Sequence, residues 1–134
     1  MDTKSQHLLV ELFSCDIEAL QDKILLTELL HKAALAADVT IVQSIFHQYS
    51  PQGITGIVII EESHLSIHTW PEFGYASVDF YTCGEGNPEK ALHVIQRGLN
   101  SERTEIIKID RGMSLTGTAM KVKYHKTIKH TEIV

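Results

Sequence analysis

The stretch Glu61–Glu72, which reads EESHLSIHTWPE, decides the fold of this 134-residue chain. Apolar and polar side chains alternate over residues 65–70, which is the period-two pattern of a β-strand. Pro-Glu-Phe-Gly at 71–74 then has the composition of a tight hairpin loop, in which the glycine can take a positive φ. Residues 75–83 (YASVDFYTC) alternate again. The sequence therefore predicts an antiparallel hairpin at the centre of the fold.

Further strand and helix signals flank this hairpin. Segments rich in β-branched or alternating apolar residues predict strands at 7–13, 39–49, 54–61 and 104–109. An apolar stripe at helical spacing predicts a helix from an N-cap at Asp16 to about Ala37. Asn87-Pro88 has the composition of a helix start and predicts a second helix. Beyond Gly112 the signal fades, and the basic segment 121–129 is interpreted as a solvated tail.

These signals together predict the fold class. Strands outnumber helices and short turns join most of them, so we expect an α+β fold. Its architecture would be a two-layer sandwich, with an antiparallel-rich sheet and two main helices on one face. The length of 134 residues and the hydrophobic content of 43% fit a single domain over residues 1–134 with a real core.

Composition narrows the functional classes. The formal net charge of −5 gives no reason to expect nucleic-acid binding, which requires a basic face. The two cysteines, Cys15 and Cys83, are far apart and indicate no disulfide framework, as is usual in a reducing compartment. Because the chain shows neither an apolar leader nor an apolar run long enough for a membrane span, we expect a cytoplasmic protein with no membrane partner.

Polar and aromatic side chains gather on one face of the predicted hairpin. If Trp70 pairs with Tyr75 across the loop, the antiparallel register follows directly. The expected opposite pairs are His68 with Ser77, Ser66 with Asp79, His64 with Tyr81, and Glu62 with Cys83, which also places the backbone of Ser63 beside Cys83. A solvent face would favour Lys, Glu and Thr instead. This composition therefore indicates a functional surface.

Several chemistries are open on this surface. His64 and His68 lie roughly 13 Å apart if a strand rises about 3.3 Å per residue, which is too far to share one ion, so we expect no metal site. Ser63 or Cys83 could each form an activated nucleophile–base pair with His68. A Gly-x-Ser-x-Gly elbow is absent from the sequence, so an ordinary hydrolase is weakly supported. The residues alone leave the reaction undetermined.

The run from Glu62 to Glu72, followed by Gly74-Tyr75-Ala76 and Thr82-Cys83-Gly84, resembles the signature of bacterial and archaeal S-adenosylmethionine decarboxylase proenzymes. The likeness extends in weaker form from His7 to about Gly112. It implies a zymogen that cleaves itself and builds a pyruvoyl cofactor from its own serine.

The resemblance also implies roles for individual residues. The hydroxyl of Ser63 would attack the carbonyl of Glu62, dividing the chain into a β chain of residues 1–62 and an α chain of residues 63–134. The pyruvoyl group left at position 63 would form a Schiff base with the substrate and serve as the electron sink. His68, which we expect on the Ser63 face, would be the processing base, and the hydroxyl of Thr55 would assist. Cys83 would donate the proton to the product.

The substrate implied is S-adenosylmethionine, whose decarboxylated product serves polyamine (spermidine) biosynthesis. Its sulfonium is a cation without hydrogen-bond donors, which aromatic faces hold well. Tyr49 and Trp70 match positions with that role, and Glu72 is a candidate contact to polar groups of the substrate. The resemblance further implies a homodimer or higher homo-oligomer, in which Tyr49 and Trp70 of one subunit serve the other subunit's site.

Departures from the family pattern keep two alternatives open. Thr55 stands where the family usually has serine, and Ser5-Gln6, Gln48 and Gln52 are also atypical. One alternative is a pyruvoyl-dependent arginine or ornithine decarboxylase; the other is a non-catalytic member that binds substrate or a partner. The sequence assigns no role to His64 or to the tail 113–134.

Overall fold

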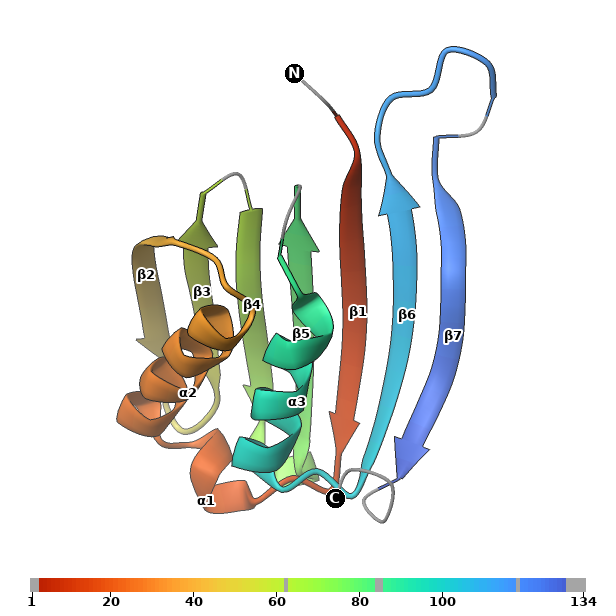
Figure 1. Ribbon diagram of the computed structural model, residues 1–134. Coiled ribbons are helices and arrows are strands. Elements are labelled where there is room, and N and C mark those ends of the chain that lie inside the picture. The colour runs from red at the N-terminus through yellow and green to blue at the C-terminus, as the bar shows by residue number, and fades with distance from the viewer. Residues whose placement is uncertain (1–2, 62, 84–85, 118, 130–134) are drawn as a thin grey trace.

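A computed structural model describes residues 3–61, 63–83, 86–117 and 119–129 (Figure 1). These residues form one seven-stranded sheet in the order β2-β3-β4-β5-β1-β6-β7, in which every neighbouring pair is antiparallel. The strands are β1 (Ser5–Phe13), β2 (Ile41–Gln48), β3 (Ile54–Ile60), β4 (Ser63–Trp70), β5 (Tyr75–Thr82), β6 (Arg103–Arg111) and β7 (Lys121–Lys129).

Helices cover a single face of this sheet (Figure 1). They are α1 (Ile17–Leu20), α2 (Lys23–Ala36) and α3 (Pro88–Leu99), and a short 3₁₀ turn, η1 (Pro71–Phe73), joins β4 to β5. The expected α+β two-layer sandwich is therefore confirmed. Within the described ranges, no helix is both long and apolar enough to cross a membrane.

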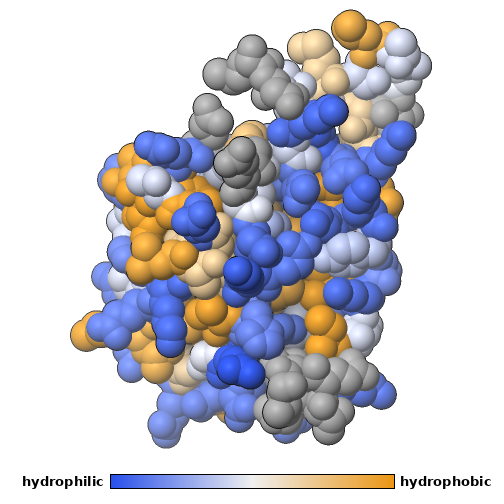
Figure 2. Space-filling view, in the orientation of Figure 1, coloured by the Kyte–Doolittle hydropathy of each residue, from blue (hydrophilic) through white to orange (hydrophobic). Residues whose placement is uncertain are grey.

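The core fills the space between the helices and the sheet. Leu26 and Leu30 of α2 and Ile95 of α3 are fully buried against the inward side chains of the strands, such as Leu65 and Ile67 of β4. Burial of apolar side chains is the main stabilising contribution of such a sandwich. On the outside of the helix-bearing face, hydrophilic residues predominate, with apolar groups between them (Figure 2).

The helix expected from Asp16 to Ala37 is wrong in one respect, because the structure divides it in two. Asp16 caps α1, as predicted, by accepting from the N–H of Glu18 at 3.2 Å. Asp22 then caps a new helix by accepting from the N–H of Leu25 at 3.0 Å. The second cap interrupts the helix although the apolar stripe runs on, because an N-cap residue takes an extended backbone conformation.

The basic segment 121–129, for which the sequence predicts no strand, also forms one. Residues 121–129 form β7, which pairs with β6 from Arg103–Lys129 to Asp110–Lys121. Only Tyr124 and Ile128 of this strand pack against the core, and its lysines are exposed, so the segment lacks the apolar alternation of a typical strand. The tail is thus solvated, as expected, but ordered as an edge strand.

The register of the central hairpin is confirmed. Trp70 pairs with Tyr75, His68 with Ser77, Ser66 with Asp79 and His64 with Tyr81. Gly74, at φ +61°, closes the connecting turn in the left-handed conformation. The remaining expected pair involves Glu62, which lies outside the described residues.

The face of the sheet opposite the helices carries the polar residues singled out in the sequence. Among the described elements, none covers this open face (Figure 1). Large apolar side chains on its strands are exposed at Leu9, Ile45, Ile59 and Trp70, by 40%, 56%, 38% and 40% respectively. The open face thus exposes large apolar side chains among its polar ones.

Candidate active site

Ser63 and Cys83 meet at one end of the central hairpin, where β4 begins and β5 has just ended. The Oγ of Ser63 accepts a hydrogen bond from the backbone N–H of Cys83 at 3.0 Å. The half-buried Cys83 thiol in turn lies 3.6 Å from the Tyr81 hydroxyl. The predicted proximity of residues 63 and 83 is therefore observed.

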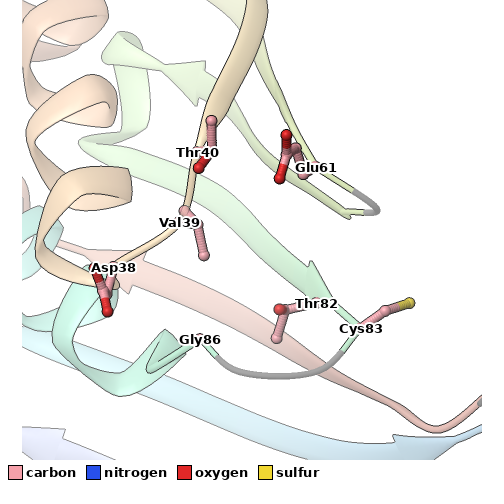
Figure 3. A pocket seen from close by; sticks show the side chains of 7 residues that line it. All are labelled: Asp38, Val39, Thr40, Glu61, Thr82, Cys83 and Gly86. Atoms are coloured by element: carbon pink, nitrogen blue, oxygen red, sulfur yellow. The ribbon is translucent and has the colours of Figure 1, made fainter.

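A hollow of about 490 Å³ lies beside this end of the hairpin (Figure 3). It is lined by the segment that follows α2, by Glu61 and by the end of β5. Cys83 stands at its rim, with its thiol directed away from Val39 and Thr40 (Figure 3). The second cysteine, Cys15, is buried in the core, and burial raises the pKa of its thiol to about 11. Cys83 is therefore the more accessible thiol of the two.

A second group of predicted site residues lies at the opposite end of β4. The Oγ1 of Thr55 is 3.0 Å from Nδ1 of His68 and accepts a hydrogen bond from the hydroxyl of Tyr49 at 3.2 Å. Because Thr55 accepts from Tyr49, its own proton is available to His68. The Trp70 ring lies 6.5 Å from the His68 ring, between centroids, and stacks on Tyr75. Tyr49, Thr55, His68 and Trp70 thus form one constellation.

Glu72 lies next to this constellation, in the 3₁₀ turn. Its Oε2 accepts a hydrogen bond from the Gln52 side chain at 3.0 Å; Glu72 is exposed and Gln52 is half-buried. The turn after β4 and the loop before β3 are thereby linked. Glu72 is accessible for contact with a ligand at this end of the sheet.

The two groups do not meet within one chain. Ser63 and His68 are five residues apart on β4, which corresponds to roughly 16 Å along a strand. Strand alternation also directs these two side chains to opposite faces. The expectation that His68 shares the face of Ser63 is therefore wrong, because the two residues are separated by an odd number of positions, five, along the strand. In a single chain, His68 cannot reach Ser63.

A third cluster lies between the two groups, on β1, β4 and β5. The Nε2 atoms of His7 and His64 are 2.6 Å and 3.2 Å from Oδ2 of Asp79, and the Ser66 hydroxyl donates to the same carboxylate. Burial raises the pKa of Asp79, but the hydrogen bonds from His64, His7 and Ser66 outweigh it and hold the pKa well below its usual range. Asp79 is therefore an anion throughout the neutral range.

This cluster contains functional candidates that the sequence reasoning missed. His7 comes from β1 and Arg111 from β6, and the Nη1 of Arg111 lies 2.9 Å from Nδ1 of His7. β1 lies beside β5, and β6 is the next strand along, because β1 enters the sheet between β5 and β6. The sequence held one signal for His7: the alternation of residues 7–13 puts it on the face away from the core-facing Leu8. Such a pattern does not reveal the order of the strands in the sheet.

Comparisons with known proteins identify the family of this chain. The family model described as S-adenosylmethionine decarboxylase matches residues 6–112. The chain is 44% identical over 114 residues to the S-adenosylmethionine decarboxylase proenzyme 2 of Halalkalibacterium halodurans, covering 84% of this chain and 90% of that protein. It is 45% identical over 113 residues to the S-adenosylmethionine decarboxylase proenzyme of Bacillus cytotoxicus, covering 84% and 87%.

A solved structure gives the same result. The crystal structure of the adenosylmethionine decarboxylase from Aquifex aeolicus superimposes with a TM-score of 0.77 at 35% identity, covering 88% of this chain and 98% of that one. The fold and the sequence matches thus define an α+β decarboxylase-type domain. The chain belongs to the S-adenosylmethionine decarboxylase family.

Proposed function

We propose that this chain is a self-processing, pyruvoyl-dependent S-adenosylmethionine decarboxylase that acts in the cytoplasm and supplies decarboxylated S-adenosylmethionine for spermidine biosynthesis. The observation that carries the proposal is the position of Ser63. It begins β4 with its hydroxyl held 3.0 Å from the backbone of Cys83, in a chain whose relatives are named as proenzymes of this activity. A serine between two strands can serve cleavage of the chain, and the half-buried thiol next to it can then deliver a proton.

The residues present fit a cofactor made from the chain itself. Ser63 supplies the hydroxyl for cleavage at its junction with Glu62, and the Cys83 N–H, which contacts that oxygen, orients it. When present, a pyruvoyl group at position 63 supplies an electrophilic carbonyl that withdraws electrons from the substrate. Cys83 is the group placed to deliver a proton beside it, in the role of a general acid.

The rest of the site is proposed to come from a second copy of the chain. His68 lies roughly 16 Å from Ser63 along β4, far beyond hydrogen-bond reach, and Thr55 lies beside His68 on β3. If two open faces pack about a two-fold axis that runs across the strands, the Ser63 end of one subunit lies against the His68 end of the other. The exposed apolar side chains of that face support such an interface, because a homodimer would remove them from water.

The substrate contacts follow from the same arrangement. Tyr49 and Trp70 are both partly exposed beside His68 and offer aromatic faces to a sulfonium cation. Glu72, exposed in the adjacent turn, can accept hydrogen bonds from polar groups of the substrate. In the dimer these three side chains would serve the Ser63 of the other subunit.

Intact-mass analysis and a decarboxylation assay test the proposal. Freshly purified protein should appear as two fragments cut between residues 62 and 63, whereas Ser63→Ala should stay whole. Cys83→Ala should be cut normally but release CO₂ slowly. CO₂ release is measured in parallel from S-adenosylmethionine, arginine and ornithine. A wild-type chain that stays uncut would overturn the self-processing, and release only from a basic amino acid would overturn the substrate.

A further inference from the structure

We propose that Tyr81 is a positioning residue for the Cys83 thiol, and that His7, His64 and Arg111 hold the Tyr81 ring in place. The catalytic consequence rests on the function proposed above, but the contact itself does not. Tyr81 lies at the end of β5 and Cys83 directly follows its last residue, two positions on, so the two side chains lie on the same side. The Cys83 thiol donates to the Tyr81 hydroxyl at 3.6 Å, a normal separation for a sulfur donor.

The Tyr81 ring is contacted by three side chains from three different strands. The His64 ring of β4 stacks on it at 5.7 Å between centroids with an interplanar angle of 26°. The His7 ring of β1 meets it edge-on at 5.4 Å and 74°. The guanidinium carbon of Arg111, on β6, lies 4.9 Å from its centroid, in cation–π range. A tyrosine so enclosed has little freedom to turn.

Asp79 fixes the orientation of the two histidines. The Arg111 guanidinium can only donate, so Nδ1 of His7 must accept its hydrogen bond, and Nε2 of His7 carries the proton that points at Asp79. Nε2 of His64 approaches the same carboxylate oxygen. The carboxylate therefore anchors both rings that pack on Tyr81, which gives His64 a role that the sequence did not assign.

The same proton assignment argues against a metal site in this cluster. Candidate ligand atoms of His7, His64 and Asp79 lie within 4.8 Å of one another, a spacing that could hold an ion. A neutral imidazole that binds metal through Nε2, however, must carry its proton on Nδ1. Nδ1 of His7 faces Arg111, which cannot accept a hydrogen bond. The cluster is thus built as a hydrogen-bonded clamp on Tyr81.

The clamp determines where the Cys83 proton is presented. A cysteine side chain has three staggered rotamers, and the one observed directs the thiol at the Tyr81 hydroxyl. The hydrogen bond is made by the protonated thiol, which is the form that a proton donor needs. Loss of the hydroxyl should therefore release the thiol, with an effect of roughly two- to ten-fold for one hydrogen bond of ordinary strength.

Alkylation of Cys83 tests the contact directly. The Ser63→Ala chain, which should stay uncut, is treated with iodoacetamide, and labelling of the Cys83 peptide is followed by mass spectrometry. Adding Tyr81→Phe should accelerate this labelling roughly two- to ten-fold. The matched control is Tyr124→Phe, whose hydroxyl contacts Glu89 away from Cys83 and whose loss should change nothing. An unchanged or slower rate in Tyr81→Phe would overturn the proposal.

Two further measurements separate the parts of the proposal. His64→Ala should accelerate labelling in the same direction, because Tyr81 loses its stacking partner; no change would overturn the clamp. In the otherwise wild-type chain, Tyr81→Phe should leave cleavage and KM unchanged and lower kcat by a similar two- to ten-fold factor. Unchanged kcat would overturn the catalytic consequence. If the wild-type chain neither cuts itself nor releases CO₂, the proposed function fails, while the alkylation rates still decide the contact.

Discussion

Co-expression of two inactive variants tests whether the active site is shared between subunits. Ser63→Ala lacks the cleavable serine, and His68→Ala lacks the proposed processing base. Because these residues lie roughly 16 Å apart along β4, neither variant can repair the other inside one chain. In a mixed dimer, one of the two sites combines the intact Ser63 of one subunit with the intact His68 of the other.

The expected yield follows from two-fold symmetry. Equal amounts of the two variants that pair at random give about half mixed dimers, and each mixed dimer has one complete site. About half of the His68→Ala chains should then be cut, together with none of the Ser63→Ala chains. Decarboxylation should recover to about a quarter of the wild-type rate. Different tags on the two variants allow each chain to be followed by intact mass.

The controls and the contrary outcome are equally definite. Each variant expressed alone should stay whole. Ser63→Ala with Cys83→Ala should recover no more activity than Cys83→Ala alone, because both residues belong to the same end of the same subunit. If the mixture yields no cut His68→Ala chain although the tags show mixed dimers, or if His68→Ala cuts itself alone, the shared site is refuted.

Three further predictions concern stability. Thr69→Val should lower the free energy of unfolding in urea by about 2–4 kcal/mol, because the buried hydroxyl accepts from the N–H of Ile54 and donates to the last carbonyl of α1, both at 2.9 Å. Gly56→Ala should lower the thermal midpoint, since the added Cβ would lie 2.1 Å from the Phe46 ring. The depressed pKa of Asp79 means that its stabilising effect is present above its unfolded pKa of about 4 and is lost as the pH falls through the lower folded pKa. Urea midpoints of the wild type should therefore fall more steeply below pH 4 than those of Asp79→Asn, and equal slopes would contradict this assignment.

The central hairpin was predictable because two local constraints determine it. Alternation assigns each side chain of β4 and β5 to a face, and the four-residue connection sets the register of the pair. The division of the predicted helix at Asp22 was missed because the apolar stripe continues at helical spacing on both sides of this residue. A single capping hydrogen bond from Asp22 begins the second helix. β7 was missed because it is an edge strand in which only Tyr124 and Ile128 face the core.

The site was predictable to the extent that it depends on one hairpin. The proximity of Ser63 and Cys83 follows from the register, and the separation of Ser63 from His68 also follows from counting residues along β4. The clamp on Tyr81 could not be predicted from the sequence. It needs His7 and Arg111, which come from strands whose positions depend on the order of the whole sheet. Sequence periodicity predicts which face a residue occupies, whereas long-range packing decides which strand is its neighbour.

Sheet order also explains how a chain could be cut at residue 63 without falling apart. The proposed β chain would hold β1, β2 and β3, and the proposed α chain would hold β4 to β7. In the sheet, β3 pairs with β4, and β1 lies between β5 and β6, so three hydrogen-bonded strand pairs join the two fragments. Helix α2 of one fragment also packs on α3 of the other. Neither fragment could bury its apolar surface alone, so folding would have to precede the proposed cleavage. The same interleaving would hold the new end of β4 beside Cys83 after the cut.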